Sequence, residues 1–106
     1  MEWYQNMELN KDDYETVSYY DAHSEQVIKY YNIECAFDIE TTSQLYNGEK
    51  CAYMYIWMFG IGETVYYGRT WEQFEEFMQM LIYQLDLNLY NRLIIYVHNL
   101  GYEFQF

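Results

Sequence analysis

Residues 33–42 read IECAFDIETT, and this stretch decides the fold. Ile33 to Ile39 is a short apolar run with β-branched and aromatic side chains, which is typical of a buried strand. Residues two positions apart on a strand project from the same face, so Asp38 and Glu40 are expected side by side at the strand's end. Two carboxylates placed in this way repel each other unless a cation or a proton compensates.

The following segments predict two more strands. Asn47-Gly48 is a turn dipeptide of the kind that joins antiparallel strands. The second strand is expected at Cys51 to Phe59 and the third at Thr64 to Gly68, with glycines breaking the chain between them. Both connections are too short for a crossover helix, so antiparallel pairing is expected.

A helix is expected after the third strand. Thr70 and Gln73 have the spacing of a capping box, which satisfies amide donors at a helix start. Apolar side chains then recur every three or four residues on one face, namely Trp71, Phe74, Phe77, Met78, Leu81 and Leu85. Glu72, Glu75 and Glu76 lie in the first turns, where the helix dipole favours negative charge, so a solvated helix start accounts for them.

The last recognisable element is a fourth strand at Arg92 to Val97, after a loop over Asp86 to Asn91. A helix that joins the third and fourth strands predicts that these two are parallel neighbours in a mixed sheet. The expected fold class is therefore α/β, with a mixed sheet of about four strands and one main helix.

Composition narrows the classes of function. The chain has 106 residues, with 17 Asp and Glu against 5 Lys and Arg, a net charge of -12, and 52% apolar residues. The apolar content excludes a disordered acidic tail. A self-sufficient DNA binder would cluster Lys and Arg against phosphates, so the charge argues against one. The negative sign points to a basic partner, to bound metal ions, or to membership of a larger assembly.

Targeting and cysteine patterns point to the cytoplasm. No run of about 18 apolar residues is present, so neither a transmembrane helix nor a membrane partner is expected. The N-terminus lacks the apolar region of a secretory signal. Cys35 and Cys51 have no second pair, and we interpret them as two small buried thiols in a reducing compartment.

The chain divides near residue 34. Residues 1–34 form an acidic, tyrosine-rich segment with 8 acidic residues against Lys11 and Lys29. Residues 35–106 are more apolar and better patterned. No Gly/Ser-rich linker separates the two parts, so the N-terminal segment is free to pack onto the rest.

A second polar segment, YVHNLGYEFQF, occupies residues 96–106. An asparagine and an aromatic side chain at a strand end can hold a splayed nucleotide by hydrogen bonding and stacking. Alternatively, the segment is a strand followed by a helix that Asn99 caps. By the same reasoning, Asp38 and Glu40 alone are compatible with an ordinary exposed strand end. The residues by themselves leave both alternatives open.

Together and in this order, the two segments are similar to a known family. FDIETT (37–42) and HNLGYEF (98–104) resemble the first and second motifs of the 3′-5′ exonuclease domain of family B DNA polymerases, especially the protein-primed enzymes of small tailed phages. The resemblance covers residues 35–106 and implies a partial ribonuclease H-like fold.

The resemblance also implies roles for single residues. Asp38 and Glu40 would be catalytic carboxylates that bind a divalent metal, Mg²⁺ or Mn²⁺. Glu103 would take the place of the second motif's acid, which is usually an aspartate. The residues that would hold a single-stranded primer end are Thr41, His98, Asn99 and Tyr102.

The implied function is that of the N-terminal exonuclease segment of a phage-type DNA polymerase, acting on single-stranded DNA ends in the cytoplasm of a bacterial host. The third exonuclease motif and the polymerase domain would lie beyond residue 106. We therefore expect the segment to be inactive alone, with single-stranded DNA or the remainder of a polymerase as its partner.

Two other hypotheses fit the composition. The chain could be a small acidic phage-encoded or prophage-encoded inhibitor that mimics DNA and binds a basic nucleic-acid-binding host protein, in the manner of an anti-CRISPR protein. The acidic residues 1–34, which the resemblance does not cover, favour this hypothesis. A metal-binding remnant without a partner is the third alternative.

Overall fold

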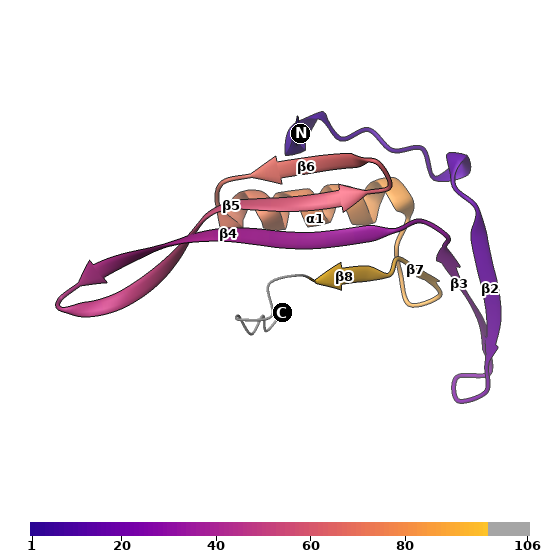
Figure 1. Cartoon of the computed structure of the whole chain (residues 1–106). Helices are drawn as coiled ribbons and strands as arrows, with labels where there is room; N and C mark the ends of the chain where they lie inside the picture. Colours follow the sequence, from indigo (N-terminus) through magenta and orange to yellow (C-terminus); the bar gives the residue numbers. More distant parts are fainter. Residues whose placement is uncertain (98–106) are drawn as a thin grey trace.

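The computed structural model describes residues 1–97, except for the side chains of residues 43–46 and 50–52. This part of the chain forms two mixed sheets and one α-helix (Figure 1). The five-stranded sheet has the order β1 (Glu2–Trp3), β6 (Thr64–Gly68), β5 (Glu49–Ile61), β4 (Cys35–Tyr46) and β8 (Ile95–Val97). The three-stranded sheet has the order β2 (Thr16–Asp21), β3 (Gln26–Tyr31) and β7 (Asn91–Arg92). The helix α1 spans Trp71–Leu85, and two short 3-10 helices span Tyr4–Asn6 (η1) and Lys11–Asp13 (η2).

The hairpin of β4 and β5 is longer than the sequence predicts. Its antiparallel register runs from Cys35 opposite Ile61 to Tyr46 opposite Glu49. Asn47 and Gly48 both have positive φ, which confirms the expected tight turn. The predicted end of the first strand at Ile39 was wrong, because the β-branched residues after it continue the pairing as an arm beyond the sheet (Figure 1).

The helix α1 agrees with its sequence pattern. Thr70 caps it, with the amide N–H of Gln73 donating to Oγ1 of Thr70 at 3.2 Å and the amide N–H of Thr70 donating to Oε1 of Gln73 at 3.3 Å. Phe74, Phe77, Leu81 and Leu85 are buried. Trp71 departs from the predicted buried face, since it is 41% exposed at the helix start.

The position of the fourth strand corrects one expectation. The strand β8 is parallel to β4 and lies beside it, with Cys35 opposite Ile95 and Phe37 opposite Val97. It is not a neighbour of β6, because α1 carries the chain across β5 and β4 to the far edge of the sheet. This strand also begins later than predicted, since Asn91–Arg92 forms β7 in the other sheet.

The core lies between the five-stranded sheet and α1 (Figure 1). Its centre is Trp57, which is fully buried, contacts the rings of Phe74 and Phe77, and donates from Nε1 to the carbonyl of Thr70 at 2.9 Å. Phe37 and Ile39 of β4 face this core, while the residues between and after them are more exposed.

Residues 1–34 supply part of the same core. Tyr4, Met7 and Tyr31 are each at most 4% exposed and belong to the core cluster. The side chain of Gln84 on α1 holds the N-terminal segment at two points. Its Nε2 donates to the carbonyl of Met7 at 2.9 Å, and its Oε1 accepts from the amide N–H of Leu9 at 2.8 Å.

The hairpin of β2 and β3 forms the second sheet with β7 and stands at one end of the molecule (Figure 1). Within the described residues, no helix is both long enough and apolar enough to span a bilayer.

Candidate active site

The candidate carboxylates lie in the middle of β4. Phe37 and Ile39 are buried against α1, Asp38 is half-buried and Glu40 is exposed. Because side chains alternate along a strand, Asp38 and Glu40 share the face of the sheet that is turned away from α1. The structure therefore confirms their common face. The expected position at the end of the strand was wrong, since β4 continues to Tyr46.

The local geometry of Asp38 fixes one of its oxygens. Oδ1 accepts a 2.8 Å hydrogen bond from the amide N–H of the next residue, Ile39. Across the strand pair, Asp38 lies opposite Met58 and Glu40 lies opposite Ile56. The two carboxylates thus stand beside half-buried apolar side chains, where an uncompensated pair of negative charges is less well solvated than at an open surface.

A β-bulge follows the two carboxylates. The register passes from Glu40 opposite Ile56 to Thr41 opposite Met54, which makes Tyr55 the additional residue. Bulges bend the strand and redirect side chains, and they are frequent next to active sites. Thr41, expected at a primer end, is half-buried directly after this irregularity.

Four of the expected site residues, His98, Asn99, Tyr102 and Glu103, lie outside the described residues. The strand that leads to them is described. Its last residue, Val97, lies opposite Phe37, one position before Asp38.

One residue on this face was not singled out from the sequence. Tyr96 of β8 lies opposite Ala36 and is 59% exposed. It therefore shares the face of Asp38, on the neighbouring strand. Alternation of side chains along the fourth strand could have placed Tyr96 on one face of the sheet. Because this strand is nearly all apolar, its sequence does not indicate which face is exposed to solvent.

Within the described residues, the metal ligands expected from the sequence are the two carboxylates on β4. Among residues 1–97, no group of three His, Cys, Asp or Glu side chains is placed to hold an ion. Asp38 and Glu40 offer only oxygen ligands, which suit Mg²⁺ or Mn²⁺ better than soft metals. The two carboxylates suit such an ion chemically, but they supply only part of the ligands that it needs.

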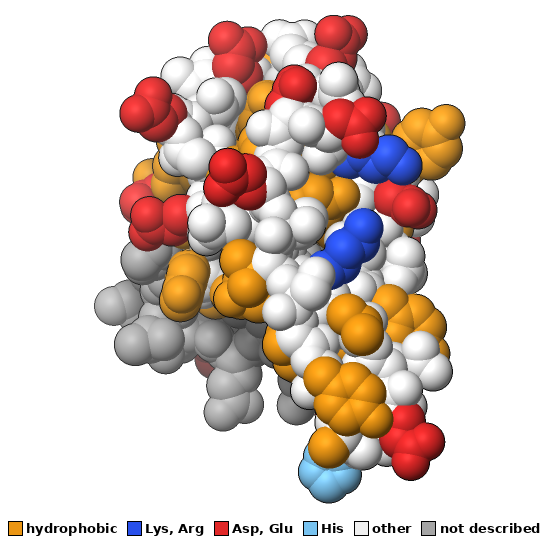
Figure 2. All heavy atoms as spheres, turned by 90° about the vertical axis from the view of Figure 1, so that its right-hand side faces the viewer, with side chains coloured by type: hydrophobic (Ala, Val, Ile, Leu, Met, Phe, Trp, Pro, Cys, Tyr) orange, Lys and Arg blue, Asp and Glu red, His pale blue; other side chains and the backbone are white. Residues whose placement is uncertain are grey.

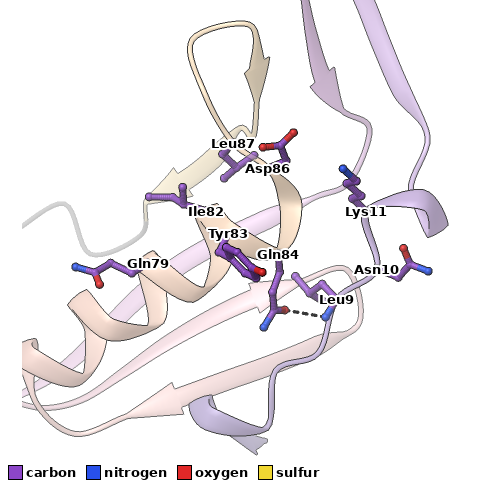
Figure 3. Close-up of a pocket in the computed structure, with 9 residues that line it drawn as sticks. All are labelled: Leu9, Asn10, Lys11, Gln79, Ile82, Tyr83, Gln84, Asp86 and Leu87. Carbon is purple, nitrogen blue, oxygen red and sulfur yellow. Dashed lines mark hydrogen bonds between the residues drawn. The ribbon is translucent and has the colours of Figure 1, made fainter.

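A separate groove of about 840 Å³ lies between the C-terminal half of α1 and residues 9–11 (Figure 3). Leu9, Ile82 and Leu87 give it an apolar wall, and Lys11 and Asp86 lie at its border. Figure 3 also shows the hydrogen bond between Gln84 and Leu9 in this groove. Since α1 packs on the face of the sheet opposite Asp38, the groove is not part of the carboxylate site.

Shifted pKa values lie away from the carboxylates. Burial raises the pKa of the Cys35 thiol to about 11. Burial, and then the hydrogen bond to Glu76, raise the pKa of Tyr4. Cys35 is fully buried, as expected for one of the two thiols, and the side chain of Cys51 lies outside the description.

No protein-family model, no curated protein and no solved structure matches this chain.

Proposed function

We propose that this chain is the N-terminal exonuclease segment of a phage-type, protein-primed DNA polymerase, with a partial ribonuclease H-like fold. In this proposal it contributes to metal-dependent 3′-5′ proofreading of single-stranded DNA ends. Two carboxylates do not complete a two-metal site, so we expect the segment to be inactive alone.

The observation that carries the proposal is the pairing of β8 with β4. The two strands are parallel, and Val97 lies opposite Phe37. The last described residue before the second motif therefore lies one position before the level of Asp38 on the neighbouring strand. Two motifs separated by about sixty residues in the sequence gain a reason to act together, because β8 ends beside the part of β4 that carries Asp38.

The chemistry follows from the residue types. Asp38 and Glu40 would hold a divalent cation through their oxygens, and the hydrogen bond from the Ile39 amide would orient the Asp38 carboxyl group. A bound divalent ion supplies activation of a water for attack on a phosphodiester. Tyr96 offers an exposed aromatic face on the same side of the sheet for a stacked base.

Paramagnetic broadening by Mn²⁺ tests the metal site. We expect Mn²⁺ to broaden the amide resonances of Asp38, Ile39 and Met58 first, because these surround the paired carboxylates. Asp38→Asn keeps Oδ1 as an acceptor for the Ile39 amide but lowers the negative charge, so it should abolish this selective broadening.

Glu63→Gln is the matched control, since Glu63 is an exposed acid in the turn between β5 and β6. The control should leave the broadening unchanged. Broadening spread evenly over all acidic residues, or broadening that survives Asp38→Asn, would remove the metal site from the proposal.

A second candidate function has its own observation. Of the 8 acidic residues in residues 1–34, all except Asp21 are exposed. Figure 2 shows several acidic side chains spread over one side of the molecule. A surface of this kind suits a DNA mimic that occupies the basic channel of a nucleic-acid-binding host protein.

Affinity capture from bacterial lysate separates the two candidates. The DNA-mimic function requires recovery of a basic nucleic-acid-binding protein that high salt or competing DNA releases. It also requires that Asp12→Asn with Asp13→Asn weakens the capture while Asp38→Asn does not. Recovery of no such protein would exclude this second function.

A further inference from the structure

The strand β2 is an open edge of the three-stranded sheet. In the described residues, β3 is its one ladder neighbour. Thr16 to Tyr20 are exposed at every position. Figure 2 views the molecule from the side on which β2 and β3 lie, and hydrophobic side chains gather over its lower part, where the hairpin lies.

Two hydrogen bonds establish which backbone groups of β2 point outward. The amide N–H of Asn32 donates to the carbonyl of Glu15, so Glu15 faces β3. Lys29 of β3 lies opposite Ser18, and its amide N–H donates to the carbonyl of Tyr90. Lys29 therefore forms its backbone hydrogen bond on the side of β3 that is turned away from β2. Because backbone direction alternates along an antiparallel pair, Thr16, Ser18 and Tyr20 direct their N–H and C=O groups away from β3.

The outward edge carries few of the usual protections against strand pairing, since its one charge is Asp21 at the end of the strand. Its sequence, TVSYYD, has no lysine and no proline, and its register with β3 is unbroken. Its exposed apolar side chains include Val17 at 39%, Tyr19 at 44% and Tyr20 at 64%. An edge of this length and composition is suited to accept another strand.

We propose that a second copy of this chain occupies the edge, with the two β2 strands antiparallel about a two-fold axis at Tyr19. The result is one continuous six-stranded sheet across the dimer. This inference does not depend on the proposed exonuclease function, because β2 belongs to residues 1–34, outside the motifs.

Repulsion between like charges distinguishes this register from the neighbouring one at Ser18. A two-fold axis perpendicular to the sheet keeps each face of the first copy continuous with the same face of the second. At such an axis, one residue of β2 lies directly opposite the same residue of the other copy. An axis at Ser18 places Asp21 of each copy opposite Glu15 of the other, which gives two such pairs in the dimer. Like charges directly opposite each other are destabilising. An axis at Tyr19 instead places Asp21 opposite Val17 of the other copy, so no two acidic residues of the paired strands lie opposite each other.

The register at Tyr19 also makes favourable apolar pairs. Tyr19 lies opposite Tyr19 of the other copy, and cross-strand aromatic pairs stabilise antiparallel sheets. Since Glu15, Val17 and Tyr19 bond inward to β3, the pair at the axis is of the non-hydrogen-bonded type, with Cα atoms about 4.5 Å apart.

Engineered disulfides test both the dimer and its register. In a Cys51→Ser background, Tyr19→Cys should form an intermolecular disulfide under mild oxidation, because about 4.5 Å lies in the Cα range that disulfides accept. Tyr20→Cys is the matched control and should form no intermolecular disulfide, since Tyr20 lies opposite Ser18 of the other copy. Efficient linking by Ser18→Cys but not by Tyr19→Cys would overturn the register, and equal linking at all three positions would overturn ordered pairing.

Light scattering with size-exclusion chromatography tests the dimer without cross-linking. The wild-type chain should have twice the 13.2 kDa mass of one copy, and the dimer fraction should rise with salt, because two chains of charge -12 repel each other. Tyr19→Lys and Ser18→Pro should each give monomers with unchanged circular dichroism. Tyr83→Lys changes an 86% exposed residue on α1 and should leave the dimer intact.

A wild-type chain that stays monomeric at all concentrations and salt levels would overturn the proposal. This result is expected if β2 instead pairs with a strand of another polypeptide. Growth into open fibres, or dimers that survive both Tyr19→Lys and Ser18→Pro, would also overturn it.

Discussion

The hydroxyl of Tyr31 donates a 2.6 Å hydrogen bond to the carbonyl oxygen of Leu85, the last residue of α1. Tyr31 ends β3 and is 4% exposed. Asn91 completes the contact, because its Nδ2 donates to the carbonyls of Leu85 and Asp86 at 3.1 and 2.9 Å. The second sheet is thus joined to the helix end through carbonyls that an α-helix leaves without internal partners.

Tyr31→Phe should lower the free energy of unfolding by about 1–2 kcal/mol, since it removes the buried hydrogen bond to Leu85 and the longer one from Asn91 Nδ2 while keeping the ring. Urea denaturation measures the change. Tyr30→Phe is the matched control on the adjacent, more exposed position, and it should alter stability by less than about 0.5 kcal/mol. An equal effect of the two substitutions would mean that the 2.6 Å contact contributes nothing specific.

Gly68→Ala should destabilise the core strongly. A Cβ at Gly68 would overlap the indole ring of Trp57, which is fully buried and has no space to move away. Overpacking of this kind costs about 1–3 kcal/mol. In contrast, a Cβ at Gly60 would meet the carbonyl oxygen of Ala36 at 3.8 Å, an ordinary contact, so Gly60→Ala should be tolerated. Thermal unfolding of the two variants in parallel provides the comparison, and equal melting temperatures would contradict it.

Asp86→Gly should stabilise the chain. Asp86 caps α1 in the left-handed conformation, with φ of 53°, which costs a non-glycine residue roughly 1–2 kcal/mol. Its negative charge also opposes the helix dipole at this end. Since glycine loses more backbone entropy on folding, a net gain of about 0.5–1 kcal/mol is expected. Asp86→Ala removes the charge but keeps the strain, so a gain as large as that of glycine would show that charge alone is responsible.

Alkaline pH should weaken the fold through Cys35. Burial raises the pKa of this thiol from 9.0 to about 11, so the folded chain holds the proton where the unfolded chain has released it. The stabilising contribution is complete below pH 9 and is lost as the pH rises through about 11. The free energy of unfolding should fall by up to about 1.4 kcal/mol per pH unit in this window from Cys35.

Cys35→Ala provides the comparison for this pH dependence. It should be less stable than wild type at pH 7, because it leaves a cavity in the core. Its decline between pH 9 and 11 should be shallower, although the raised pKa values of Tyr4, Tyr14 and Tyr66 still contribute at the alkaline end. Identical slopes for the two proteins would exclude Cys35 as a cause.

The sequence predicted the elements whose signals are local. The capping box at Thr70 and the regular apolar spacing were sufficient for α1, and the strand at Thr64 to Gly68 was predicted with its observed bounds. The common face of Asp38 and Glu40 also followed from local alternation. These features depend on residues a few positions apart, so a single sequence contains the information.

The features that were missed depend on distant partners. The place of β8 beside β4 is decided by how α1 crosses the sheet, which short-range patterns do not specify. The strands β2 and β3 lie in a polar stretch without clear alternation, and Tyr31 and Asn91 give them their contact with the helix end. Likewise, Tyr4 and Met7 enter a core whose other buried members run from Tyr31 to Leu85, more than twenty positions later in the sequence.

The two hydrogen bonds of the Gln84 side chain allow the detachment of the N-terminal segment to be measured separately from the unfolding of α1. The amide proton of Leu9 is held by the Gln84 side chain rather than by a strand or helix ladder. Its exchange with solvent deuterium therefore reports the separation of this segment from α1, and amides inside α1 report the opening of the helix itself. If Leu9 exchanges at the rate of the helix amides, the acidic N-terminus and the motif-bearing sheet unfold as one cooperative unit. If it exchanges faster, the segment detaches on its own while the carboxylate-bearing sheet stays intact.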